Sequence, residues 1–418
     1  MQVQKTETID LNGNKKSAFG HIKNWFLSLG PGIITAALVF GPSKMTITSK
    51  LGADYGFQLI WIIVIAIFFM VLFTNMGARI GQVADQSLLS LIRNKWGKGS
   101  AIIIGLGIFF VATSFQAGNA IGVGISIAEI RGSSPTGWII LFNVIGVLLL
   151  FFHGFYKILE KLMIALVALM LFAFTTTLIF ISPSATDIIE GFIPAVPTGS
   201  LGLVIAFFAS CFSIVGAFYQ SYLVQERKKS NPLKAADKSG SITGIIMLGI
   251  MSAMVMICAA AVLNKQGLQV TNASDMAKAL EPLFGKYSST LFLLGLFGAS
   301  FSSLIGNATV GGTLLGDAFG FSYQLDSKPV RCFIALVMVF GSIIAITFGK
   351  LPLELIVLAQ SVTIFLVPFI GIAMYAISND PKIMGGRVNS KSMKVFGAIG
   401  LLILGLLAVS NANELFFQ

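Results

Sequence analysis

A proline and a lysine lie two residues apart within the first long apolar run of this sequence, in the segment Gly41-Pro42-Ser43-Lys44. Proline removes a backbone donor and clashes with the preceding turn, so this segment can unwind a helix. In a membrane, non-helical backbone is tolerated only where it is buried in protein or lines a cavity. A lysine at that depth costs at least about 2.5–3.5 kcal/mol, so it needs a partner or a function. The segment therefore predicts a binding site at a broken helix; the alternative is a proline kink beside a lysine that reaches a water-filled vestibule.

A second polar segment interrupts the sixth apolar run, between Ser213 and Tyr222. Tyr219 and Gln220 can hydrogen-bond a ligand there, since a tyrosine in an apolar core usually finds such a partner. The alternative is ordinary helix packing through small residues such as Gly216. Two interrupted spans in corresponding positions of two halves are typical of inverted-repeat transporters, so we expect both breaks to contribute to one site.

Only a membrane-embedded bundle can position these segments. Of the 418 residues, 56% are hydrophobic and 11% are charged, and the mean hydropathy is +0.88; a soluble domain carries about 25% charged residues. The apolar runs have the length of membrane helices, roughly 18–25 residues, and not that of alternating barrel strands. We predict an all-α membrane protein with eleven spans, at about residues 31–53, 57–82, 99–128, 134–153, 155–182, 199–226, 240–263, 287–318, 329–348, 352–378 and 393–411.

Lysine and arginine recur in alternate loops, starting with the N-terminal segment. The positive-inside rule therefore places the N-terminus in the cytoplasm and the C-terminus outside. Because the positive residues are dispersed in this way, the net charge of +11 does not indicate a nucleic-acid-binding face. We predict a cytoplasmic tail over residues 1–25, a single transmembrane domain over 26–418, a short interfacial helix within 84–98, and location in the plasma (inner) membrane.

Framework motifs follow one another along the chain in a specific order. They include Gly30-Pro31-Gly32, Tyr55-Gly56, Ala78-Arg79-Ile80-Gly81, Gly298-Ala299-Ser300, Leu358-Ala359-Gln360, Val367-Pro368-Phe369 and Ile383-Met384-Gly385. In this combination the chain resembles the NRAMP family of divalent-metal transporters. The resemblance implies a LeuT-type fold: two inverted five-helix repeats (about 30–182 and 199–378) plus an eleventh helix (about 393–411), with spans one and six broken.

The functional motifs of that family are changed in this sequence. The metal-binding Asp-Pro-Gly-Asn reads Gly41-Pro42-Ser43-Lys44, and Met-Pro-His falls on Ala217-Phe218-Tyr219. The acidic pair that the family uses for proton transfer falls on Gln116 and Asn119, and the metal-binding glutamine of span ten falls on Leu366. Metal sites usually need carboxylate, imidazole or thioether ligands. We therefore expect neither metal binding nor proton coupling of the family type.

The side chains at a helix break decide which charge it accepts, because the break offers both amide and carbonyl groups. Lys44 then predicts an anion site, so we predict a secondary transporter of a small anion, bicarbonate or another small oxyanion or carboxylate. Two alternatives stay open: a divalent cation (Mn, Fe or Mg type) held through carbonyls and water, or a transport-inactive sensor or scaffold. No triad, metal cluster or phosphate loop suggests an enzyme.

The predicted site residues form two sets. The substrate-binding set is Gly41, Pro42, Ser43, Lys44, Ile214, Ala217, Phe218, Tyr219 and Gln220, and the pathway-lining set is Gln116, Asn119, Gln360 and Thr363. We expect no catalytic residue, no metal ligand and no cofactor. The expected partners are a small inorganic or carboxylate anion and the lipid bilayer, not nucleic acid; the sequence leaves the oligomeric state open and is compatible with a monomer.

Overall fold

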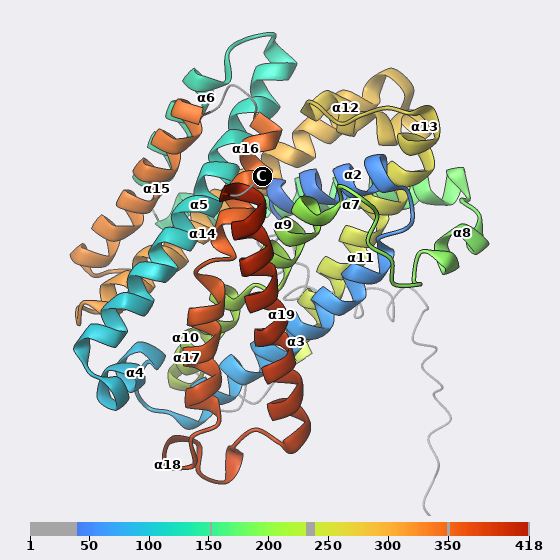
Figure 1. Cartoon of the computed structure of the whole chain (residues 1–418). Coiled ribbons are helices and arrows are strands. Elements are labelled where there is room, and N and C mark those ends of the chain that lie inside the picture. The colour runs from blue at the N-terminus through green and yellow to red at the C-terminus, as the bar shows by residue number, and fades with distance from the viewer. Residues whose placement is uncertain (1–39, 151–152, 231–238, 349–351, 417–418) are drawn as a thin grey trace, which may run out of the picture.

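The chain folds into a bundle of helices (Figure 1). The computed structural model describes residues 40–150, 153–230, 239–348 and 352–416. Within those ranges every regular element is an α-helix or a short 3₁₀ turn, which confirms the predicted all-α class. The predicted tail over 1–25 and the part of the first span before residue 40 lie outside the described residues.

The helices form two successive sets and a last helix. The first set is α2 (Pro42–Tyr55), α3 (Ile60–Val83), α4 (Leu88–Trp96), α5 (Lys98–Arg131), α6 (Pro135–Leu149) and α7 (His153–Ile181). The second is α9 (Leu201–Cys211), α10 (Ile214–Ser230), α11 (Ser239–Val262), α14 (Ser288–Ala318), α15 (Lys328–Phe348), α16 (Pro352–Thr363) and α17 (Val367–Ser378), followed by α19 (Lys391–Phe416). Short helices lie between them: α8 (Ala185–Glu190), α12 (Ala273–Ala277), α13 (Glu281–Phe284) and α18 (Pro381–Met384).

By length and composition, seven helices among the described residues can cross a membrane. The pair α16 and α17, bent by 41° at its break, would make an eighth. Ten of the eleven predicted ranges coincide with a helix or a helix pair, and the described part of the first range coincides with α2. The described part of the first span, α2, has 14 residues and α6 has 15, so both are shorter than the other spans.

Close helix contacts depend on small residues. A methyl group at Gly105 of α5 would lie 2.1 Å from the Cβ of Ala318 of α14. A methyl group at Gly77 of α3 would lie 1.9 Å from the carbonyl oxygen of Ala217 of α10. In lipid, where apolar side chains gain little by leaving one hydrocarbon for another, such close approach is a main source of helix association. The glycines therefore bring the helices that carry the polar residues into direct contact.

The sixth span is broken between α9 and α10. Helix α9 ends at Cys211, and Ser213 has a φ of 45°, a left-handed conformation that is costly for a residue with a side chain. The helix then resumes at once, because the amide of Ala217 donates to the Ser213 carbonyl at 2.8 Å. The predicted break over residues 213–222 is therefore wrong in extent: it lies at the N-terminal edge of that segment, and Ile214–Ser230 is helical.

The two ends of the bundle are named here after two acidic residues. The Asp317 end contains α4, the last turn of α14 and α18; the Glu129 end contains the last turn of α5, α12 and α13, and Figure 1 shows them at the bottom and the top. Helix α4 lies within the predicted range 84–98. Its Leu88, Leu89 and Ile92 are buried against the bundle, and its last turn is exposed, so the helix is amphipathic as expected.

Candidate functional site

A cavity of about 450 Å³ lies in the middle of the bundle, where α2 begins and α9 gives way to α10. Its polar and glycine lining comes mainly from six regions of the chain: Gly41, Ser43 and Lys44; Thr74; Asn119; Ser210, Ser213, Gly216, Tyr219 and Gln220; Ser303, Gly306, Asn307 and Thr309; and Gln360. The lining extends to Leu325 and Arg331 at the Asp317 end. The cavity is thus formed by both halves of the chain.

The start of α2 is tightly enclosed. Gly41 precedes the helix in an extended conformation, and its carbonyl accepts the first helical bond, from Met45 N at 3.3 Å. A Cβ atom at Gly41 would lie 2.9 Å from the Ser303 hydroxyl oxygen and 3.3 Å from the Asn119 amide oxygen. Glycine therefore fits at this position without any movement of the two neighbouring helices, whereas a side chain would have to displace the Ser303 hydroxyl.

Neutral oxygen and nitrogen atoms surround this helix start. The Gln360 amide donates to the Ser43 hydroxyl at 2.9 Å, which ties α16 to α2. Asn119 is 5% exposed and lines the cavity. Its amide makes no hydrogen bond within the described part of the chain, although buried polar groups are normally paired. An unpaired amide at a cavity wall indicates a group that a ligand or water completes.

Lys44 is buried and points away from bulk solvent. Its ammonium donates to the main-chain carbonyl of Ser210, in the last turn of α9, at 2.9 Å. The last carbonyls of a helix have no partner within the helix and carry its negative dipole end. The end of α9 therefore provides a partner for a lysine at this depth.

Seven of the thirteen predicted site residues line the cavity: Gly41, Ser43, Lys44, Asn119, Tyr219, Gln220 and Gln360. The other six lie in the helix packing around it: Pro42, Gln116, Ile214, Ala217, Phe218 and Thr363. Gln116, for example, accepts a bond from the Asn307 amide at 3.2 Å instead of facing the cavity.

Sequence reasoning missed Thr74, Ser210 and Ser303 as site residues. Ser210 contributes a main-chain carbonyl, which has no signature in a sequence. The left-handed conformation of Ser213, with a φ of 45°, likewise cannot be recognised from the sequence.

The charged side chains of the described lining are Lys44 and Arg331, and the same lining contains neither a carboxylate nor a histidine. Within the described residues there is also no group of three or more His, Cys, Asp or Glu side chains placed to hold a metal ion. Any cation in this cavity would therefore meet hydroxyl, amide and main-chain oxygen atoms.

At the Asp317 end, three helices share one buried carboxylate. The Tyr222 hydroxyl of α10 donates to Asp317 at 2.6 Å and accepts from the Leu89 amide of α4 at 3.2 Å. Arg93 of α4 donates to the main-chain carbonyl of Asp317. These contacts hold α4, α10 and α14 together at the Asp317 end, toward which the cavity lining extends.

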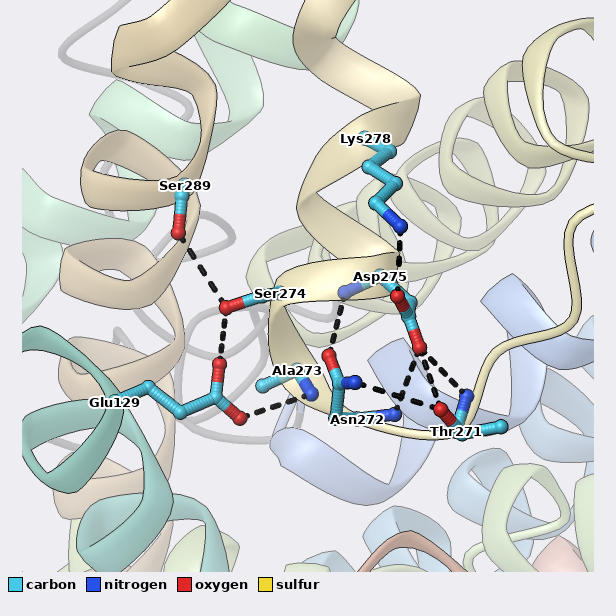
Figure 2. Close-up of polar contacts among 8 residues, drawn as sticks. All are labelled: Glu129, Thr271, Asn272, Ala273, Ser274, Asp275, Lys278 and Ser289. Carbon is cyan, nitrogen blue, oxygen red and sulfur yellow. Dashed lines mark hydrogen bonds and ion pairs between the residues drawn. The ribbon is translucent and has the colours of Figure 1, made fainter. Parts of the chain in front are cut away.

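At the Glu129 end, α5 holds the segment that follows α11. Figure 2 shows the Glu129 carboxylate facing Ala273 and Ser274 at the start of α12. The carboxylate accepts from the Ala273 amide at 3.1 Å and from the Ser274 hydroxyl. Asn272 and Asp275 form a capping box at the same turn, so the first amides of α12 are satisfied from two sides.

Sequence comparison finds relatives that align over nearly the whole chain. The chain is 24% identical over 412 residues to the divalent metal cation transporter MntH of Erwinia tasmaniensis, covering 96% of this chain and 98% of the relative. It is 24% identical over 393 residues to MntH of Deinococcus radiodurans, covering 90% and 88%.

Structural comparison identifies the fold. A manganese transporter from Eremococcus coleocola superposes with a TM-score of 0.72 at 19% identity, covering 96% of this chain and 90% of that one. MhsT in complex with L-phenylalanine superposes with a TM-score of 0.57 at 15% identity, covering 90% and 98%. These likenesses confirm the predicted LeuT-type fold.

The comparisons contradict the predicted anion substrate, bicarbonate included, and with it the predicted anion partner. The relatives that align over nearly the full length are named divalent metal cation transporters. The physical reason for the error lies in Lys44: its charge is engaged by the Ser210 carbonyl, so it does not by itself make the cavity a site for an anion.

The family assignment depends on a match along almost the entire sequence. A profile described as "Natural resistance-associated macrophage protein-like" (Nramp) matches residues 32–412. The match begins ahead of α2 and extends into α19. The chain belongs to the Nramp family.

Proposed function

We propose that this protein is a secondary transporter that carries a divalent metal cation across a membrane. Relatives aligned over nearly all of the chain carry that name, and the fold is one that transporters use. The observation that carries the proposal is the convergence of Ser43, Asn119 and Gln360 on one central cavity, beside the start of α2 and the break between α9 and α10.

The ligand atoms favour a cation that accepts oxygen donors. Hydroxyl, amide and main-chain oxygen atoms are the ligands of hard divalent ions such as Mg²⁺ and Mn²⁺. Without a carboxylate to replace its hydration shell, the ion keeps part of that shell, as Mg²⁺ often does in proteins. A cavity of about 450 Å³ has room for such a partly hydrated ion.

The proposal is tested by metal uptake into proteoliposomes that contain a trapped metal-sensitive dye. Mn²⁺, Fe²⁺ and Mg²⁺ are added outside, and protein-free liposomes give the background. We expect uptake by the natural protein and an at least roughly tenfold slower rate for Asn119→Ala, which removes one ligand amide.

Asn143 provides the matched control. It is a buried asparagine on α6 that lies away from the cavity lining and bonds within its own helix, to the Ile139 carbonyl at 2.8 Å. Asn143→Ala should transport like the natural protein. Absence of uptake of all three metals would overturn the proposal, and a co-purifying partner in that case would favour a transport-inactive sensor.

We also propose that the Asp317 end faces the cytoplasm, as the distribution of lysine and arginine suggests. The N-terminus is then cytoplasmic, the C-terminus is outside, and residues 26–418 form one transmembrane domain in the plasma membrane. Cys332 is exposed in the first turn of α15, near this end, whereas Cys211 and Cys258 are buried. A membrane-impermeant maleimide should label Cys332 only after the cells are opened. Labelling in intact cells would show that the Asp317 end faces the outside instead.

A further inference from the structure

Lys44 occupies a position in α2 that its own helix disfavours. It is the third residue of the helix, where the exposed amides make the helix end positive. It is nevertheless 5% exposed, with its ammonium 2.9 Å from the Ser210 carbonyl. Its place is therefore set by α9, whose negative end faces the positive end of α2.

The carbonyl end of α9 needs a cationic or donor partner. The helix ends at Cys211, and the left-handed Ser213 turns the chain away before α10 begins. The carbonyls of the last turn are thus left without helical donors. Both Lys44 and Ser210 line the central cavity, together with Ser43 and Asn119.

We propose that Lys44 is a tethered cation that occupies the carbonyl end of α9 and that the transported metal ion must displace from it. This inference rests on the proposed metal transport. Two positive ions cannot share one small carbonyl cluster without strong repulsion in a buried site. The ammonium leaves Ser210 when the metal enters and returns when the metal departs.

This competition makes Lys44 a determinant of affinity. Because Lys44 hydrogen-bonds the carbonyl end of α9, this end of the helix has a cationic partner even when no metal ion is bound. The bound metal is held less tightly than it would be by the same oxygen atoms without the lysine. Lys44 should therefore raise the KM for the metal while helping the metal to leave.

The test compares Lys44→Met, which keeps the length of the side chain and removes its charge, with Lys44→Arg, which keeps the charge. Mn²⁺ binding is measured by calorimetry on detergent-solubilised full-length protein, and KM and Vmax are measured in proteoliposomes. We expect Lys44→Met to lower Kd and KM for Mn²⁺ by about tenfold or more, with Vmax unchanged or reduced. Lys44→Arg keeps the positive charge and should not lower Kd or KM.

Lys50 offers a matched control on the same helix. Its ammonium also donates to a main-chain carbonyl, that of Val270, at 3.1 Å, but it lines a separate cavity near the Glu129 end. Lys50→Met should leave Kd and KM unchanged. Thermal unfolding of all variants shows whether each has folded, and a misfolded Lys44→Met is replaced by Lys44→Gln.

The outcomes separate this inference from the proposed function. If the natural protein transports Mn²⁺ and the folded, uncharged variant shows no lower Kd or KM, the inference is overturned and the function stands. If the natural protein is inactive but Lys44→Met binds Mn²⁺, the inference is supported and the function is overturned. If neither binds Mn²⁺, both are overturned.

Discussion

The two ends of the bundle are joined by contacts of different kinds. At the Asp317 end the carboxylate is 4% exposed, and it ties together α4, α10 and α14. At the Glu129 end the carboxylate is half-buried, and it accepts from the first amide and the Ser274 hydroxyl of a short connecting helix, α12 (Figure 2). Both are acid-centred, but only the first is sealed from water.

The difference has energetic consequences. A buried hydrogen bond leaves an unsatisfied group when one partner is removed, whereas a half-exposed group is rescued by water. Segments with few buried contacts also open locally at lower cost than the core does. A transporter that exposes its site to each side in turn needs both ends to open, so we expect the Glu129 end to open more readily.

The largest effect is expected from Asp317→Ala. This change leaves the buried Tyr222 hydroxyl without its acceptor, which should lower the free energy of unfolding by about 1–3 kcal/mol. Thermal or denaturant unfolding in detergent measures the loss. Because Tyr222→Phe removes the same bond, the double variant should lose clearly less than the sum of the two single changes. Additive losses would show that the two groups do not act together.

A smaller effect is expected from Glu129→Ala. The Ala273 amide and the Ser274 hydroxyl lose their acceptor at the start of α12, which should cost about 0.5–1.5 kcal/mol locally. Hydrogen exchange should accelerate over α12 and leave the core of α14 unchanged. Glu129→Gln keeps an acceptor and should show a weaker change. Equal acceleration at the Asp317 end would contradict the independence of the two ends.

The smallest effect is expected from a surface ion pair at the Asp317 end. The hydrogen bond from Lys95 holds the pKa of Asp380 below its ordinary value. A lowered folded pKa contributes stability above about pH 4 that is lost as the pH falls through the folded value. The melting temperature should therefore fall slightly less between pH 5 and pH 3 for Asp380→Asn than for the natural protein. Lys95→Met should reproduce the effect, and identical pH profiles would show that the pair contributes nothing.

Most of the fold could be predicted from the sequence, because long apolar runs have few alternatives in a membrane. The helices at residues 60–83, 98–131 and 288–318 begin and end within a few residues of the predicted spans. The extent of the α9–α10 break could not be predicted, since polar residues such as Gln220 are tolerated in a helix that faces a cavity.

The location of the central cavity could be predicted from the sequence, but the charge of its ligand could not. Seven of its lining residues could be identified, because a proline and polar side chains within apolar spans mark a cavity. The prediction of an anion substrate relied on the charge of Lys44. The partner of that charge is a main-chain carbonyl, and since every residue carries one, the sequence does not reveal it. A buried charged side chain therefore predicts the charge of a ligand only when the groups that neutralise the side chain can also be identified from the sequence.

The close contact around Gly41 links the side chains that can stand at position 41 to the residue at position 303. A Cβ atom there meets the Ser303 hydroxyl at 2.9 Å and Asn119 at 3.3 Å. An aspartate, which the resemblance implies at this position in the family, fits only after the hydroxyl of Ser303 has turned away or been removed. A return to a carboxylate at position 41 is therefore coupled to α14, where Ser303 must adopt another rotamer or be replaced by a smaller residue.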